Sequence, residues 1–111
     1  MLTGMILERR FSDEQLEQVI EEATIYMCAC PAQLAVQLRS LRDLFRYQQD
    51  CELEPGNDGT VHRAIATTTM RAYALMEDCL DQVLILEGWN RAALKMPEGL
   101  RRKRSEMLEK D

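Results

Sequence analysis

Proline and glycine divide this chain of 111 residues into three stretches, and each stretch is long enough for several turns of helix. Pro31 interrupts the first half of the chain, the run Pro55-Gly56-Asn57-Asp58-Gly59 forms a second break, and Gly88 forms a third. Proline pushes the residue before it away from the helical region, and clusters of Pro, Gly, Asn and Asp are typical of loops. The first predicted helix therefore begins at residue 12 and ends at a tight turn over residues 28–31, the second runs from Pro31 to about residue 51, and the third runs from about residue 60 to its stop at Gly88.

Within each stretch the apolar residues recur every three or four positions, which is the spacing of one face of a helix. Val, Ile and Thr seldom alternate with polar residues, so strands are not expected. We expect an all-α fold, an antiparallel bundle of three long helices whose axes cross at roughly 20°. The predicted core positions are Leu16, Ile20, Ala23 and Met27 in the first helix, Leu34, Leu38, Leu41 and Phe45 in the second, and Ile65, Thr69, Ala72, Met76, Cys79, Val83 and Leu86 in the third.

The clearest boundary signals lie at the start of the first helix and at the end of the third. Ser12 followed three residues later by Gln15 is a capping box, and Phe11 with Leu16 forms the matching hydrophobic staple. Gly88 is typical of the residue that follows the last helical turn. We expect Trp89 and the residues just after it to close that end of the bundle.

A bundle of three helices with 5% aromatic residues has a thin core, which favours a fourth helix or a second copy of the chain. We therefore expect a homodimer, and a short C-terminal helix that begins near Pro97 and runs through Leu108. The expected organisation is a single helical domain over residues 1–111. Within it, residues 1–11 form an N-terminal arm, residues 12–96 the bundle, and residues 97–111 a basic C-terminal tail or short helix.

The sequence predicts neither a signal peptide nor a membrane span. The apolar run at residues 5–7 is too short for a signal peptide, and no stretch approaches the roughly 20 apolar residues of a membrane span. We therefore expect a cytoplasmic protein without a membrane span. In a reducing compartment, its four cysteines are expected to be thiols or ligands rather than disulfides.

Charge is distributed unevenly along the chain. The formal net charge is −5, which argues against nucleic acid as the partner of the whole surface. Residues 91–111 carry +3, which leaves −8 on residues 1–90. The favoured interpretation of the basic tail is a solvated segment that folds back on the acidic body, and contact with an anionic partner is the alternative. Its four consecutive cations are Arg101, Arg102, Lys103 and Arg104.

Three cysteines are expected to converge at one end of the bundle. Cys28 and Cys30 lie at the first break, and a third helix that returns antiparallel carries Cys79 back to the same level. With Met27 or Met76, these thiols would suit Cu(I), Zn(II) or an iron–sulfur cluster, or they would act as a redox switch. Core filling is the competing interpretation, because the spacing C-x-C is a weak signal.

No catalytic constellation is found in the sequence. His62 is the only histidine, and the carboxylate pairs lack the Glu-x-x-His motif of di-iron bundles. The sequence therefore predicts a non-enzymatic protein-interaction or regulatory module that acts as a homodimer and needs no cofactor. The alternative is a thiol-based metal-binding or redox-sensing protein that uses Cys28, Cys30 and Cys79.

Overall fold

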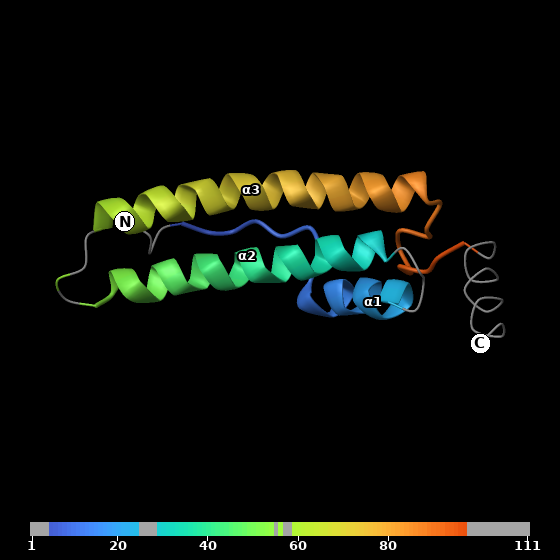
Figure 1. Ribbon diagram of the computed structural model, residues 1–111, viewed down its shortest axis with the longest axis horizontal. Coiled ribbons are helices and arrows are strands. Elements are labelled where there is room, and N and C mark those ends of the chain that lie inside the picture. Colours follow the sequence, from blue (N-terminus) through green and yellow to red (C-terminus); the bar gives the residue numbers. More distant parts are fainter. Residues whose placement is uncertain (1–4, 25–28, 55, 57–58, 98–111) are drawn as a thin grey trace.

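The protein is all-helical over the residues that its computed structural model describes, and Figure 1 shows how the helices are arranged. The model describes residues 5–24, 29–54, 56 and 59–97. The helices are α1 (Asp13–Thr24), α2 (Cys30–Glu52) and α3 (Gly59–Leu86). α2 and α3 form a long antiparallel hairpin, and α1 packs against α2. The prediction of an all-α fold is confirmed.

α1 begins at the predicted capping box. Ser12 Oγ accepts a hydrogen bond from the Gln15 backbone at 3.0 Å, and Gln15 Oε1 accepts one from the Ser12 backbone at 2.8 Å. Phe11 and Leu16, the predicted staple, are both fully buried in the core. Because these contacts are local, the residues around Ser12 are sufficient to define the helix start.

α1 is the short member of the bundle. It has 12 residues, against 23 in α2 and 28 in α3, so two of the three helices are long in the described part of the chain. Its two ion pairs to α2, Asp13 with Arg42 and Glu17 with Arg39, show that the two helices are antiparallel. The predicted continuation of this helix through Met27 falls on residues 25–28, which lie outside the described residues.

α2 begins at Cys30, one residue before the predicted start, and Pro31 occupies its first turn. Two of its four predicted core positions, Leu38 and Phe45, are buried. The other two, Leu34 and Leu41, are partly buried at the edge of the core. The helix therefore presents a face rotated slightly from the prediction, since it must contact α1 on one side and α3 on the other.

The predicted core face of α3 is wrong by about one residue. Only Thr69 of the seven predicted positions is buried, while Ile65 and Leu86 are exposed and the others are partly buried. The side that contacts α2 is instead made of Ala66, Thr69, Tyr73, Glu77, Leu80 and Leu84. The hairpin therefore buries a face of α3 that includes a tyrosine and a carboxylate, and the more apolar flank of α3 is not buried against α2.

Hydrogen bonds make this polar core face possible. Thr69 Oγ1 donates to the carbonyl of Ile65 at 2.7 Å, and Glu77 accepts a bond from the backbone of Arg10 at 2.8 Å. Tyr73 accepts a bond from Arg42 Nε at 2.7 Å. A buried polar group is costly only when it lacks a partner. Thr69 finds its partner within α3, while Tyr73 and Glu77 find theirs on α2 and on the arm.

The end of α3 follows the prediction. Gly88 has φ +77°, and the backbone of Trp89 donates to the carbonyl of Leu84 at 2.9 Å, which is a Schellman ending. Trp89 and Leu94 are buried and close this end of the bundle as expected. The predicted C-terminal helix after Pro97 lies outside the described residues, as do the four cations at 101–104.

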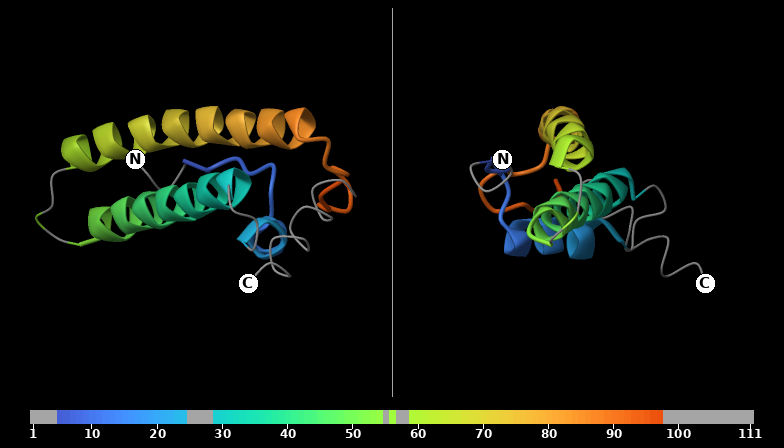
Figure 2. Two further views of the ribbon diagram at one scale, coloured as in Figure 1. Left: turned by 45° about the vertical axis from the view of Figure 1, so that its right-hand side comes forward. Right: turned by 90° about the vertical axis from the view of Figure 1, so that its left-hand side faces the viewer.

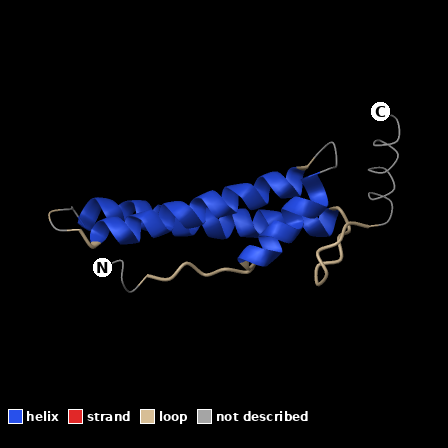
Figure 3. Cartoon of the chain, turned by 90° about the horizontal axis from the view of Figure 1, so that it is seen from below, coloured by secondary structure: helices blue, strands red, loops and turns tan. Residues whose placement is uncertain are grey.

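Residues 5–11, here called the arm, run along one side of the hairpin, between α2 and α3 (Figure 2). Gln49 on α2 donates to the carbonyl of Met5 at 3.2 Å, and Arg10 pairs with Asp78 and Asp81 on α3. Figure 3 shows the same strip of chain from below, alongside both helices. The arm thus packs within its own chain and covers this side of the hairpin.

Candidate functional site

The other side of the hairpin is not covered by any residue that the structure describes. The arm and the loop after Gly88 both contact the side of α3 that carries Glu77 and Asp81, while α1 packs against α2. A helix turns by 100° per residue, so residues about half a turn round α3 from Glu77 and Asp81 face away from the arm. This opposite flank carries the exposed large apolar residues of α3 apart from Ile85, which lies one turn after Asp81.

The exposed flank of α3 has the spacing of a coiled-coil seam. We call it the open seam, and its positions step alternately by four and three over the whole helix. It consists of Val61, Ile65, Thr68, Ala72, Leu75, Cys79, Gln82 and Leu86. None of the eight is charged, although 30% of the chain is charged. A stripe of this length without a charge is the pattern of a surface that contacts another helix.

Large side chains of the open seam are in water. The exposed fraction is 52% for Val61, 69% for Leu75 and 76% for Leu86. Burying one such side chain fully is worth roughly 1.5–3 kcal/mol, so several of them in one row give a partner a substantial gain. Single exposed apolar residues are ordinary on a protein surface, but a contiguous row marks an interaction site.

α2 extends the open seam sideways. A shallow groove of about 350 Å³ lies between the two helices, where Leu44 of α2 meets Ile65 and Thr68 of α3. Leu44 and Tyr47 are both exposed on this part of α2. A hydrogen bond with the Cys51 thiol, one turn along the helix, is the main cause that raises the pKa of Tyr47 above its ordinary value.

Two opposite charges stand beside the open seam. Arg71 and Asp78 each precede a seam position, Ala72 and Cys79, and both are exposed. Asp78 already pairs with Arg10 of its own arm at 2.5 Å, in an exposed geometry. Charges at these flanking positions set the partner and the orientation of a coiled coil.

The structure places two of the three predicted thiols. Cys30 is exposed at the first residue of α2, and Cys79 is partly buried on α3. Because Arg42 lies opposite Tyr73, Cys79 is level with Val36. Six residues separate that level from Cys30, or roughly 9 Å along the axis. Cys30, Cys79 and Cys51 form no disulfide with one another.

The remainder of the predicted thiol cluster lies outside the described residues. Cys28 and Met27 fall on residues 25–28, while Met76 is partly buried beside the core. Among the residues that the structure does describe, no group of three or more His, Cys, Asp and Glu side chains is arranged to hold a metal ion. The metal or redox cluster and the anion-binding tail both stay predictions.

Sequence reasoning found part of the open seam but assigned it to the core. Ile65, Ala72, Cys79 and Leu86 belong both to the predicted core face of α3 and to the open seam. The signal that separates the two is on the other flank, where Glu77 sits in a row with Tyr73 and Leu80. A single charged residue such as Glu77 is normally predicted to face solvent, unless the distant residue that pairs with it is known.

Comparison with family models, with curated proteins and with solved structures finds no match for this chain. None of the described helices is both long enough and apolar enough to span a membrane. The function is therefore inferred from the open seam and from the residues around it.

Proposed function

We propose that this chain is a small, non-enzymatic protein-interaction module that pairs with a second copy of itself through the open seam. The observation that carries the proposal is the row of eight uncharged positions in heptad spacing along α3, of which six are exposed and two, Ala72 and Cys79, are partly buried. A seam of this kind is stable when another helix supplies the facing side chains. A second copy supplies a seam of the same length and the same lack of charge.

The open seam is suited to an antiparallel, two-fold pairing. With the axis between Ala72 and Leu75, each Ala72 faces Leu75 of the second copy, so a small side chain meets a large one. The same register sets Val61 against Leu86 at both ends, and no seam position is left over. A two-fold interface uses one patch on both chains, which is the commonest way for a soluble protein to dimerise.

Charge complementarity favours the same register. Arg71 and Asp78 flank the seam on one edge, and an antiparallel pairing about that axis brings Arg71 beside Asp78 of the second copy. Two such pairs form by symmetry. A parallel pairing in register would instead place this edge of the two helices on opposite sides of the interface, so that Arg71 would not meet Asp78 of the second copy.

The available area is that of a stable dimer. α3 has 28 residues and is therefore about 42 Å long. α2 lies beside it at an interhelical distance of about 10 Å, so the face of the two helices together is about 20 Å wide. It therefore covers roughly 800 Å², the area that each partner buries in a typical stable complex.

A charge placed in the seam tests the proposal. Leu75→Glu puts a carboxylate at the centre of the predicted interface, and Leu53→Glu is the matched control, since both leucines are 69% exposed and Leu53 lies beyond the end of α2. We expect dimers for the native chain and for Leu53→Glu, and monomers for Leu75→Glu, in sedimentation equilibrium at micromolar concentration. A native chain that is monomeric at such concentrations would contradict the proposal.

Thiol chemistry is the second candidate function. The exposed thiol of Cys30 at the start of α2 favours it, since a helix N-terminus stabilises a thiolate. We propose that Cys28, Cys30 and Cys79 bind a soft metal ion or form a reversible disulfide only if residues 25–28 bring Cys28 close to the other two. Elemental analysis of protein purified without a metal-affinity tag decides this point: Cu, Zn or Fe at one equivalent supports it, and metal-free protein that also forms no disulfide rejects it.

A further inference from the structure

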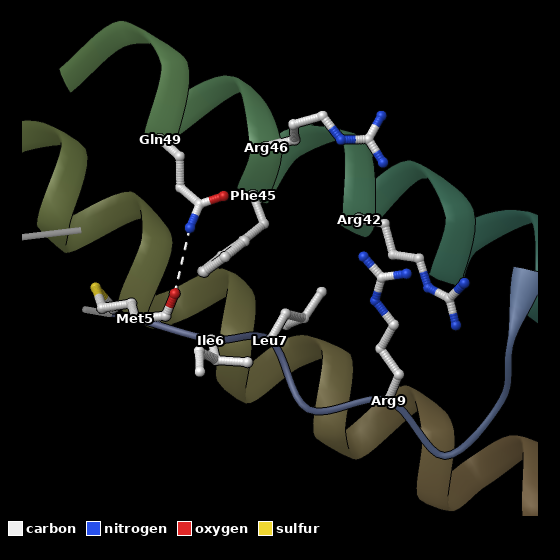
Figure 4. A pocket seen from close by; sticks show the side chains of 8 residues that line it. All are labelled: Met5, Ile6, Leu7, Arg9, Arg42, Phe45, Arg46 and Gln49. Atoms are coloured by element: carbon white, nitrogen blue, oxygen red, sulfur yellow. Dashed lines mark hydrogen bonds between the residues drawn. The ribbon is translucent and has the colours of Figure 1, made fainter. Parts of the chain in front are cut away.

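A pocket lies on the side of the hairpin away from the open seam, where the arm crosses α2 (Figure 4). Its volume is about 400 Å³, within the usual range for small-molecule sites. The arm forms one wall with the backbone of Met5 and the side chains that follow it. α2 forms the other wall, and the hydrogen bond from Gln49 to the Met5 carbonyl ties the two together.

Three arginines and no carboxylate line this pocket. They are Arg9 from the arm and Arg42 and Arg46 from α2. Residues 1–90 carry a net charge of −8, so a local group of three cations is unusual for this part of the chain. Like charges held close together destabilise one another unless an anion lies between them.

The three guanidinium groups differ in how far they are already satisfied. Arg42 is only 3% exposed, and it donates to Tyr73, to Asp13 and to the carbonyl of Phe11, so it is held in place. Among the described residues, the only ion-pair partner of Arg46 is Asp43, at 3.7 Å and exposed to solvent. Within the part of the chain that the structure describes, Arg9 has no hydrogen-bond or ion-pair partner.

Arg9 nevertheless points into the pocket. Figure 4 shows its side chain rising from the arm toward α2, so that its guanidinium group lies between those of Arg42 and Arg46 in this view. An exposed arginine without a partner would be expected to extend into solvent, away from other cations. A group held in this direction is ready to donate to an anion, and the planar guanidinium binds carboxylate or phosphate with two parallel hydrogen bonds.

The rest of the pocket is apolar. Leu7 and Phe45 are buried core residues whose side chains reach the pocket from opposite walls. An aromatic ring and a leucine offer contact area to a hydrophobic or aromatic group, but nothing to an inorganic ion. Ligand sites combine such a lining with a few polar groups that fix orientation.

We propose that this pocket binds a small organic anion, with its carboxylate or phosphate at Arg9 and Arg46 and its apolar or aromatic body against Leu7 and Phe45. This site goes beyond the proposed self-association, because it lies across the hairpin from the open seam and shares no residue with it. Binding would also bridge the arm and α2, since the cations come from both. The ligand would therefore lock the arm onto the hairpin.

Four probes separate the parts of the proposal. Phenyl phosphate and phenylacetate carry the two possible head groups on the same ring, inorganic phosphate has the charge without the ring, and benzyl alcohol has the ring without the charge. Isothermal titration of the full chain at low salt measures each affinity. We expect saturable binding of at least one aromatic anion, about tenfold or more tighter than inorganic phosphate or benzyl alcohol. The tighter of the two aromatic anions identifies the head group.

Variants test whether binding occurs in this pocket. Arg9→Gln is expected to weaken the aromatic anion at least tenfold and Arg46→Gln at least about threefold, while Arg63→Gln on α3 changes it by less than about twofold. Arg63 is the matched control because it too is exposed and has no hydrogen-bond or ion-pair partner among the described residues. Equal binding by all variants, or no saturation below about 10 mM, would overturn the proposal. Circular dichroism confirms the fold, and Arg46→Gln decides the outcome if Arg9→Gln disturbs the arm.

Discussion

Arg42 connects four parts of the molecule through one side chain. Its guanidinium group donates to Tyr73 on α3, to Asp13 on α1 and to the carbonyl of Phe11 at the end of the arm, and its stem lies on α2. Its charge also stands over the ring of Tyr73, at 5.6 Å from the centroid. Burial raises the pKa of Tyr73, and the hydrogen bond from Arg42 offsets part of that rise. The network is therefore a buried, charge-assisted one, whose members depend on each other.

Replacing Arg42 tests how much the network contributes to stability. Arg42→Met keeps the stem but removes the donor from the Phe11 carbonyl and from the Tyr73 oxygen, which keeps only its hydrogen bond with Glu77. Each buried group that loses its donor costs about 1–3 kcal/mol, so we expect the free energy of unfolding to fall by about 3 kcal/mol in urea denaturation at fixed protein concentration. Arg39→Met is the control, since its pair with Glu17 is half exposed on both sides and is worth less than about 1 kcal/mol. Equal losses for both variants would show that the network adds little.

At the scale of the elements, the ends of the helices could be predicted and the face of α3 could not. The start of α1 depends on Ser12 and Gln15, which lie three residues apart, and the end of α3 depends on Gly88. The buried face of α3 depends on Arg10 and Arg42, which lie 67 and 31 residues from their partners. Apolar periodicity describes only the distribution of apolar residues around one helix. It cannot predict that a carboxylate is buried because a backbone N–H far away in the sequence donates a hydrogen bond to it.

The Schellman ending of α3 predicts different effects for two glycines. Gly88 has φ +77°, a conformation that costs an alanine about 1–2 kcal/mol, although a Cβ there would meet Pro97 only at an ordinary 3.9 Å. Gly88→Ala should therefore lower the free energy of unfolding by that amount. Gly59, at the start of α3, has no positive φ and open space around it, so Gly59→Ala should leave stability unchanged or raise it by less than about 1 kcal/mol. Thermal melts of both variants check the contrast, and a Gly88→Ala protein as stable as Gly59→Ala would contradict the assigned ending.

At the scale of the whole molecule, the chain covers one side of its hairpin and leaves the other side open. Arg91 shows how complete the covered side is: it pairs with Asp81 at 2.7 Å and lies over the ring of Phe11 at 4.1 Å. The sequence indicated a thin core and a need for more material, and the arm supplies part of that material from within the same chain. The candidate site could be inferred from the sequence only as an apolar stripe, because which stripe stays open depends on where the arm docks.

The two-fold arrangement of the open seam makes a prediction about two charges that do not contact each other within one chain. Arg71 and Asp78 are seven residues apart, or about 10 Å along α3, so mutations at the two positions should be nearly additive in a monomer. In the proposed dimer, Arg71 of each chain lies beside Asp78 of the other chain. Arg71→Asp and Asp78→Arg should each weaken dimerisation, by about tenfold, because both symmetric pairs become repulsive.

The double variant distinguishes the register from a general effect of charge. Arg71→Asp with Asp78→Arg restores opposite charges across the two-fold axis, so its dimerisation constant should recover most of the loss, although Asp78→Arg also breaks the pair with Arg10. Sedimentation equilibrium of the native chain, the two single variants and the double variant gives the coupling directly. Additive losses in the double variant would rule out this antiparallel register. If dimerisation still depended on Leu75, the two α3 helices would then have to pair in a different register.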